Sequence, residues 1–321
     1  MGKIVKFGAA ATSEVTFSRA SEAFRLRCRA QNLSPLTCGW YAQILELFSR
    51  FLEAQEVALI REVTPDLIRL YLDELRSRNS SGTIARTYGA LRCFFGFLAR
   101  EQLIPQSPFL LVEKPRMEHK LIHPLSLDQA RLLLSAPNQK RFIGQRLWTI
   151  MVLIMDSGLR LAEVLSLRTD RINFEGNALR VMGKGNKERE VPFGTTSKQA
   201  LWNYVLRRGK IPGQDLLFVN QYGDRLCRRW VDRAFKLLGE KVGIQGVRVS
   251  PHTLRHTFAT QYIMNGGDAF SLQHILGHST LEMVKVYVGL ANRDVVLQHQ
   301  RFSPIDRMGM VPGSKRRVLV R

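Results

Sequence analysis

Prolines are concentrated in one stretch of this chain, where Pro105, Pro108, Pro115 and Pro124 separate two longer segments of helical pattern. Proline lacks the amide hydrogen that a helix or a central strand needs, so this stretch cannot form either. Basic side chains are interleaved with the prolines. The sequence therefore predicts two domains joined by an extended basic linker. The expected bounds are 15–105 for the first domain, 106–123 for the linker, 124–303 for the second domain and 304–321 for a basic C-terminal tail.

The first domain carries the sequence signals of short amphipathic helices. Ser34-Pro35 and Thr64-Pro65 each combine a side-chain N-cap with a proline at the first helical position. Apolar residues follow each pair at the i, i+3, i+4, i+7 spacing of one helical face. A further helix is expected after Ser80-Ser81-Gly82. Together with the segment before Ser34, these signals predict an all-α domain of four helices.

The second domain combines helices with a small sheet. Ser126 and Gln129 form a capping box, and the apolar run 147–155 is expected to be a buried helix. Residues 178–182 and 188–193 flank a glycine-containing turn, which predicts an antiparallel hairpin. Further helices are expected at about 159–167 and 230–242, from Ser250-Pro251 onward, and after a second capping box formed by Ser279 and Glu282. The predicted fold class is mainly α with a small antiparallel β-sheet, the second domain being α+β.

Basic residues dominate the charge of the chain. Lysine and arginine number 48 against 27 aspartates and glutamates, which gives a formal net charge of +21. Solubility alone needs far less, so the excess points to a polyanion. Nucleic acid is the simplest such partner, and an anionic membrane surface is the alternative.

Nothing in the sequence indicates membrane insertion or export. The longest apolar run is broken by Thr149 and is too short to cross a bilayer, and the N-terminus lacks the apolar core of a signal peptide. The cysteines are scattered without a C-x-x-C pair, which is typical of reduced structural thiols. We therefore expect a cytoplasmic protein with no membrane partner. The cysteines are Cys28, Cys38, Cys93 and Cys227.

The segment from Ser250 to His256 is the densest group of candidate functional residues. With Ser250 as N-cap, His252 and Arg255 lie on one face of the first helical turn. Backbone amides, a guanidinium and an imidazole would then converge on one point, which suits a phosphate. The structural alternative is an arginine paired with a carboxylate and a histidine satisfied in the core.

Other candidates are weaker when taken singly. Arg160 heads an apolar helix and needs an anion, either Glu163 or a substrate phosphate. Lys184 lies in a Gly-Lys-Gly turn, where a lysine is usually a solvated charge. His278 precedes Tyr287 by nine residues, and a tyrosine at helical spacing is most often a core or rim aromatic.

Two histidine pairs at i, i+4 spacing raise the question of a metal site. The pairs His252/His256 and His274/His278 both lack the glutamate of an H-E-x-x-H motif. His256 and His274 also lack a nearby carboxylate that would orient them as ligands. We therefore expect neither a metal ion nor another cofactor.

Taken together, these candidates resemble the tyrosine recombinases of the Xer and phage-integrase family, because their order and spacing fill every position of that family's Arg, Lys, His-x-x-Arg, His, Tyr series. The resemblance covers the whole second domain, and the helical first domain is similar to the family's SAM-like core-binding domain. The matching residues are Arg160 with Glu163 three positions later, Lys184 in Gly183-Lys184-Gly185, His252 and Arg255, His278, and Tyr287.

The resemblance implies a role for each matching residue. Tyr287 would attack phosphorus and form a 3′-phosphotyrosine, while Arg160 and Arg255 neutralise the phosphate. Lys184 would protonate the leaving 5′-oxygen, with Lys187 or Arg189 as the alternative donor. His252 would assist proton transfer from the tyrosine, His278 would donate a hydrogen bond to a non-bridging oxygen, and Glu163 would brace Arg160.

The same resemblance implies how the protein works as an assembly. Its partner would be double-stranded DNA, clamped between the two domains, and a homotetramer on a synapse of two duplexes would exchange strands through a Holliday junction. The short segment before the first helix argues against an additional arm-binding domain, which favours a mobile-element integrase or an Xer-like recombinase. Two alternatives stay open: a DNA-relaxing enzyme of the type IB topoisomerase kind and a non-catalytic DNA-binding regulator.

Overall fold

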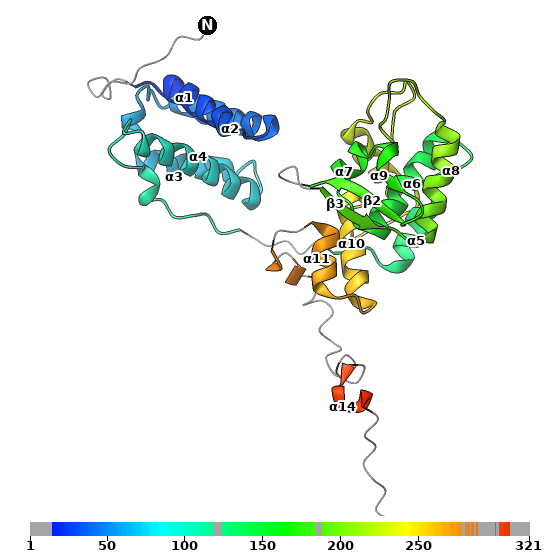
Figure 1. The fold of residues 1–321 in the computed structure, drawn as a ribbon. Helices are drawn as coiled ribbons and strands as arrows, with labels where there is room; N and C mark the ends of the chain where they lie inside the picture. Colours follow the sequence, from blue (N-terminus) through cyan, green and yellow to red (C-terminus); the bar gives the residue numbers. More distant parts are fainter. Residues whose placement is uncertain are drawn as a thin grey trace, which may run out of the picture. The chain divides into compact units, whose positions relative to one another are not determined.

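The computed structural model describes residues 15–117, 123–183, 188–277, 280–282, 284–285, 287, 299 and 302–308. The chain divides into two compact units, unit 1 at Met1–Lys120 and unit 2 at Leu121–Arg321 (Figure 1). The expected bounds of the domains, linker and tail remain a prediction.

Unit 1 is built from helices. They are α1 (Phe17–Ala30), α2 (Pro35–Ala54), α3 (Pro65–Arg76) and α4 (Ser81–Arg100), with 3-10 turns at Ile60–Glu62 and Pro108–Leu110. The side chains of Ser34, Thr64 and Ser80 each accept a hydrogen bond from the amide three residues later. These caps confirm the helix starts predicted from the Ser-Pro and Thr-Pro signals. Helix α4 is present as predicted but begins at Ser81, before Gly82, because Ser80 is its N-cap.

Aromatic side chains fill the core of unit 1. Phe48 and Phe94 are fully buried, and each packs edge-on against Phe17, with ring centroids 5.6 and 5.4 Å apart. The chain stays packed on this core beyond α4, because Val112 is also buried and its carbonyl accepts a 2.8 Å hydrogen bond from the Tyr88 hydroxyl. The first residues of the proline-rich stretch therefore belong to the packed part of unit 1.

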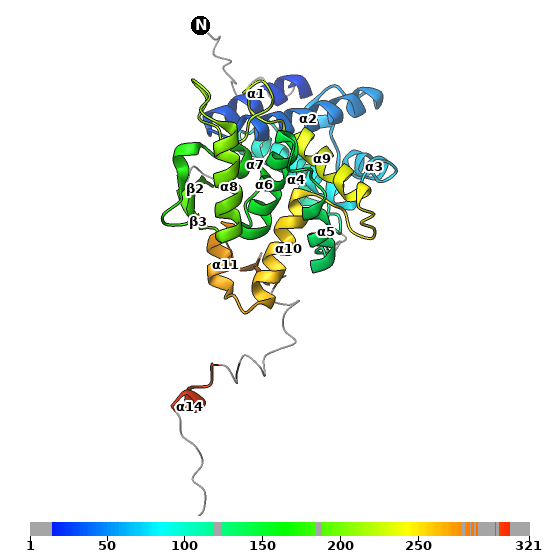
Figure 2. The same cartoon turned by 90° about the vertical axis from the view of Figure 1, so that its right-hand side faces the viewer.

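Unit 2 places a central helix among several others. Its helices are α5 (Leu127–Ser135), α6 (Phe142–Ser157), α7 (Leu161–Ser166), α8 (Thr195–Arg208), α9 (Arg228–Lys241), α10 (Pro251–Met264), α11 (Ala269–Leu276) and α14 (Pro304–Arg307). Helix α6 packs against both α8 and α10, and α11 lies beside α10 (Figures 1 and 2). The capping box of Ser126 and Gln129 is present at the start of α5, as predicted.

The sheet of unit 2 is antiparallel, with strand order β1-β2-β3. Its strands are β1 (Ile172–Asn173), β2 (Ala178–Met182) and β3 (Glu188–Pro192). Leu179 pairs with Val191 and Val181 pairs with Arg189, so these four residues share one face of the hairpin. Leu179, Val181 and Val191 are buried. The predicted hairpin and the predicted fold class, mainly α with a small antiparallel sheet, are confirmed.

Some elements differ from the sequence expectations. Strand β1 was not predicted because two residues carry no periodic signal, and helices α8 and α11 were not predicted either. Helix α7 begins at Leu161 rather than at 159, because Gly158 adopts a left-handed conformation and Arg160 is an extended N-cap. The second capping box lies outside the described residues, since Ser279 is not described.

Two further features concern the chain as a whole. All four cysteines have free thiols. Within the described part of the chain, no helix is long and apolar enough to cross a membrane.

The aromatic core of unit 1 yields a stability prediction. Phe94→Ala should lower the free energy of unfolding of unit 1 by about 3–5 kcal/mol, because it removes a fully buried ring and leaves a cavity. The shift of the denaturant midpoint, followed by circular dichroism, measures this effect. Leu70→Ala is the matched control: Leu70 is 49% exposed, so its loss should change the same quantity by less than about 0.5 kcal/mol. Equal shifts for the two variants would contradict the assigned core.

Candidate active site

A sharp turn between α6 and α7 sets the position of Arg160. Gly158 ends α6 with φ +62°, in the left-handed region that favours glycine. A Cβ at this position would collide with the ring of Phe258 and lie 2.8 Å from the side chain of Leu276. Because Gly158 has no side chain, α10 and α11 can pack closely on it and the chain can turn sharply. This turn places Arg160 at the head of α7.

Glu163 holds Arg160 at that position. One carboxylate oxygen accepts a 2.8 Å hydrogen bond from the Arg160 amide, and the other accepts a 3.0 Å bond from Arg160 Nη1. The Glu163 side chain is only 7% exposed, whereas that of Arg160 is 39% exposed. The guanidinium is thus paired on one side and open to solvent on the other. The Glu163 partner that the sequence offered for Arg160 is present.

Arg189, on β3, binds the same carboxylate. Its Nη1 and Nη2 donate to the two oxygens of Glu163 at 2.9 and 3.0 Å, and its Nε donates to the carbonyl of Ile275 at 3.2 Å. Sequence reasoning considered Arg189 only as a substitute proton donor. Its position on the buried face of an alternating strand, opposite Val181, is the signal that could have identified it as a buried ion-pair partner.

Arg255 connects the ends of two helices. It lies in the second turn of α10, whose first turn is capped by Ser250 accepting from the Thr253 amide at 3.1 Å. The residue is 5% exposed, and its guanidinium donates to the carbonyl of Gly158 and, at 2.8 Å, to that of Leu276. His252 precedes it by three residues and is exposed to solvent.

The C-terminus of α11 is where these arginines meet. A helix leaves its last carbonyls without intrahelical partners, and they form the negative end of its dipole. Three consecutive carbonyls at this end accept hydrogen bonds from three different guanidiniums. The pairs are Ile275 with Arg189, Leu276 with Arg255 and Gly277 with Arg160, the last at 3.2 Å.

The concentration of positive charge shifts the ionisation of these groups. Burial, together with the charge of Arg160, lowers the pKa of Arg255 to about 10. Partial desolvation and the charge of Arg255 also lower the pKa of His252, which favours the neutral imidazole near physiological pH. Burial alone would raise the pKa of Glu163, but hydrogen bonds and charge from Arg189 and Arg160 outweigh it and lower the pKa. The carboxylate therefore stays ionised among the arginines.

Tyr287 is buried beside His256. The two ring centroids are 4.9 Å apart, and Tyr287 is 9% exposed. Burial raises the pKa of the Tyr287 hydroxyl, and the charge of Arg255 opposes that effect. Sequence reasoning weighed His256 only as a metal ligand, so its contact with Tyr287 was missed. Its place directly after Arg255 was the available signal.

The remaining candidates are not placed by the structure. Lys184, Lys187 and His278 lie outside the described residues. Among the residues that are described, no group of three or more histidine, cysteine, aspartate or glutamate side chains is arranged to hold a metal ion. The metal-free character of the site remains an expectation, because His278 belongs to one of the two histidine pairs.

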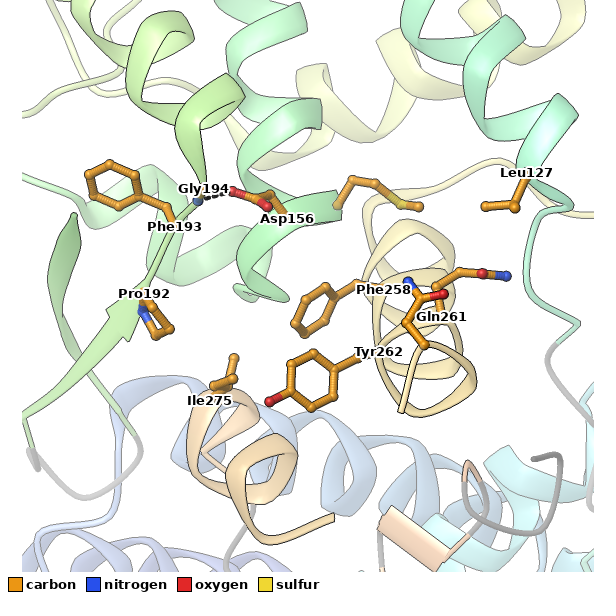
Figure 3. A pocket seen from close by; sticks show the side chains of 11 residues that line it. Leu127, Asp156, Pro192, Phe193, Gly194, Phe258, Gln261, Tyr262 and Ile275 are labelled. Atoms are coloured by element: carbon orange, nitrogen blue, oxygen red, sulfur yellow. Dashed lines mark hydrogen bonds between the residues drawn. The ribbon is translucent and has the colours of Figure 1, made fainter. Parts of the chain in front are cut away.

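A separate cavity of about 470 Å³ lies near this cluster (Figure 3). Asp156 on its wall accepts hydrogen bonds from the Gly194 amide at 2.7 Å and from the Ser197 hydroxyl at 2.5 Å. The other lining side chains are apolar, amide or tyrosine, among them Phe258 and Tyr262. Among the described residues that line it there is no lysine, arginine or histidine, which favours the arginine cluster as the place for an anionic substrate.

Comparison with known proteins identifies the family of this chain. The sequence matches the phage integrase family over residues 124–293 and the N-terminal SAM-like domain of phage integrases over residues 28–102. The chain belongs to the phage integrase family. It is a site-specific tyrosine recombinase, an enzyme of DNA recombination.

Its relatives include proteins named tyrosine recombinase XerC. The one from Anoxybacillus flavithermus is 36% identical over 265 residues, covering 80% of this chain and 88% of the relative. The one from Pelobacter propionicus is 36% identical over 268 residues, covering 83% and 88%.

Solved structures show the same fold. The Tn1549 transposon integrase in complex with transposon right end DNA matches with a TM-score of 0.70 at 20% identity, covering 90% of this chain and 99% of that one. A lambda integrase dimer bound to a core site matches with a TM-score of 0.71 at 18% identity, covering 84% and 97%.

The Glu163 carboxylate yields a prediction about pH. Glu163→Gln should lower the free energy of unfolding by about 3–5 kcal/mol at about pH 7, because the buried Arg189 guanidinium loses its anion. The pKa of Glu163 is lowered on folding, so its stabilisation is complete above the ordinary carboxyl pKa of about 4.3 and is lost as the pH falls toward the lowered value. Denaturant unfolding of wild type and variant should therefore show a difference that shrinks on acidification.

The matched control is Glu190→Gln. Glu190 pairs with Arg180 at 3.1 Å on the surface, with side chains 61% and 57% exposed. Its loss should cost less than about 1 kcal/mol. A Glu163→Gln effect as small as this, or one that grows on acidification, would contradict the buried ion pair.

Proposed function

We propose that this recombinase cuts and rejoins double-stranded DNA with Tyr287 as nucleophile and with Arg160 and Arg255 as the ligands of the scissile phosphate. The observation that carries the proposal is the convergence of these two guanidiniums on the C-terminus of α11, with Tyr287 near enough for the charge of Arg255 to act on its hydroxyl. Two forked cations at one point suit a phosphodiester.

The reaction is a transesterification. The Tyr287 oxygen attacks phosphorus, a phosphotyrosine bond forms at the 3′ side, and the bond to the 5′-oxygen breaks. Charge grows on the non-bridging oxygens in the transition state, and Arg160 and Arg255 neutralise it. Because the phosphotyrosine retains an ester bond, a 5′-hydroxyl from a second duplex can reverse the reaction, which is strand exchange through a Holliday junction.

The other candidate residues transfer protons, contact the phosphate or orient Arg160. The lowered pKa of His252 favours the neutral imidazole near physiological pH, which supports a part in removing the Tyr287 proton. Lys184 protonates the leaving 5′-oxygen, and His278 donates to a non-bridging oxygen. Glu163 orients Arg160 through its two hydrogen bonds to that residue. Its ion pair leaves Arg160 partly exposed, as a residue that receives substrate must be.

Double-stranded DNA is the partner in this proposal. The net charge of +21 supports it, and the Tn1549 and lambda integrase structures contain DNA. We propose that the enzyme acts in the cytoplasm. It would act there as a homotetramer on a synapse of two duplexes. The relatives named XerC support an Xer-like recombinase, and a mobile-element integrase shares the same site.

Substitution of the nucleophile is the direct test. Tyr287→Phe should abolish covalent trapping on a nicked suicide duplex while leaving DNA affinity close to wild type, since only the hydroxyl is lost. Denaturing gel electrophoresis detects the covalent complex, and a filter-binding titration gives the affinity. Tyr222→Phe is the matched control, because Tyr222 is 79% exposed. This variant should form the covalent complex as wild-type protein does.

The outcomes separate the alternative functions. A covalent complex formed by Tyr287→Phe would contradict the assigned nucleophile. Trapping by wild type without exchange of strands between duplexes would favour a relaxing enzyme. Wild-type protein that binds DNA without any trapping would favour a regulator.

A sulfur substrate tests the role of Lys184. A 5′-bridging phosphorothiolate leaves as a thiolate, which needs little protonation. Lys184→Ala should therefore be nearly inactive on ordinary DNA and substantially rescued on this substrate. Arg160→Ala should show no rescue, because the charge on the non-bridging oxygens is unchanged. Single-turnover cleavage rates measure both, and equal rescue of the two variants would remove Lys184 as general acid.

A further inference from the structure

Arg189 is a buried cation of the site to which the reaction above gives no task. Its side chain is 9% exposed. All three guanidinium nitrogens donate to protein atoms: two to Glu163 and one to the Ile275 carbonyl. These bonds direct the fork of Arg189 toward Glu163 and its Nε toward α11, which favours a structural role over contact with DNA or protonation of a leaving group.

Gly277 packs over this guanidinium. A Cβ on Gly277 would lie 2.9 Å from Cζ and 3.0 Å from Nε of Arg189, and its φ of +61° is itself in the left-handed region. The turn that ends α11 can cover Arg189 only because position 277 has no side chain. The same residue uses its carbonyl to accept from Arg160. Arg189 and Arg160 are thus held against one short stretch of backbone.

Arg189 and Arg160 share the two carboxylate oxygens of Glu163 unequally, and this suggests a task for Arg189. Arg189 takes both oxygens in a forked pair, so Arg160 has a single side-chain bond to one of them. Without Arg189, each Glu163 oxygen would lose one donor, and the guanidinium of Arg160 could take both oxygens in a forked pair, the geometry that carboxylates and arginines favour. Arg160 would then be drawn onto Glu163 and away from the face that it presents to solvent.

We propose that Arg189 is a positioning residue, which occupies Glu163 and the last turn of α11 so that Arg160 stays free to bind the scissile phosphate. This inference rests on the proposed function of Arg160. Arg189 acts from β3, the strand that begins directly after the segment containing Lys184, so it ties that strand to both α7 and α11. It acts through Glu163 and Arg160 and does not touch the reacting atoms.

Single-turnover cleavage of a nicked duplex, with full-length protein in saturating excess, tests this role. Arg189→Gln should slow cleavage of the bound complex about 10- to 100-fold, the usual cost of losing a partner that orients a ligand. DNA affinity should change less than about twofold, because Arg189 does not contact the duplex. Arg189→Lys keeps the charge but not the fork, so its rate should fall between those of wild type and Arg189→Gln.

Two further variants make the test specific. The double variant Glu163→Gln/Arg189→Gln should be slowed by less than the product of the two single-variant effects, because Glu163 and Arg189 both act through the position of Arg160; independent effects would multiply. The 5′-phosphorothiolate should not rescue Arg189→Gln, as it should not rescue Arg160→Ala. Arg180→Gln, in the same sheet and in an exposed ion pair, is the matched control and should cleave as wild type does.

The results separate this inference from the proposed function. Wild-type protein that fails to cleave contradicts the proposed function. Equal cleavage rates for wild-type and Arg189→Gln protein contradict the role of Arg189 alone. So does a double variant slowed by the full product of the two single-variant effects, or rescue of Arg189→Gln by the 5′-phosphorothiolate to the level of Lys184→Ala. Thermal unfolding identifies any variant that fails to fold, and Arg189→Lys then carries the comparison.

Discussion

The site depends on the last turn of α11, whose carbonyls hold three guanidiniums together. Arginines gathered at one helix end repel one another. Burial together with this repulsion lowers the pKa of Arg255. Only one carboxylate, Glu163, is paired with the cluster among the ion pairs of the described residues. The partial negative charge at the end of the helix supplies further compensation without adding another acidic side chain. A net positive site is thereby kept assembled before any phosphate arrives.

The sequence predicted those parts of the fold that depend on neighbours along the chain. The caps at Ser34, Thr64 and Ser126 and the hairpin at 178–182 and 188–193 follow from local hydrogen bonding and alternation, and the structure has them. Strand β1 and helices α8 and α11 were missed. A two-residue strand exists only because β2 lies beside it, which no window of the sequence can register.

The site was predictable to a similar extent. Arg160 and Glu163 are three residues apart, so their ion pair was open to sequence reasoning. The bond between Arg189 and Glu163 joins residues 26 positions apart, and that between Arg255 and Leu276 joins residues 21 apart. Such contacts arise from packing of α7, β3, α10 and α11, and the spacing of residue types does not contain them. His256 was missed for the same reason, since its partner Tyr287 comes from a later segment.

Because the acceptors at the end of α11 are backbone carbonyls, the cluster places unequal demands on the amino-acid sequence. Any residue has a carbonyl, so positions 275 and 276 need only be apolar enough to stay buried. Position 277 must lack a side chain, and each of the three donors must carry a planar fork of N–H groups. Apolar substitutions at positions 275 and 276 are thus compatible with an intact site, whereas replacement of a donor arginine by lysine removes the fork that the site uses. Within this cluster, the tolerance of a position to substitution is set by whether it contributes its main chain or its side chain.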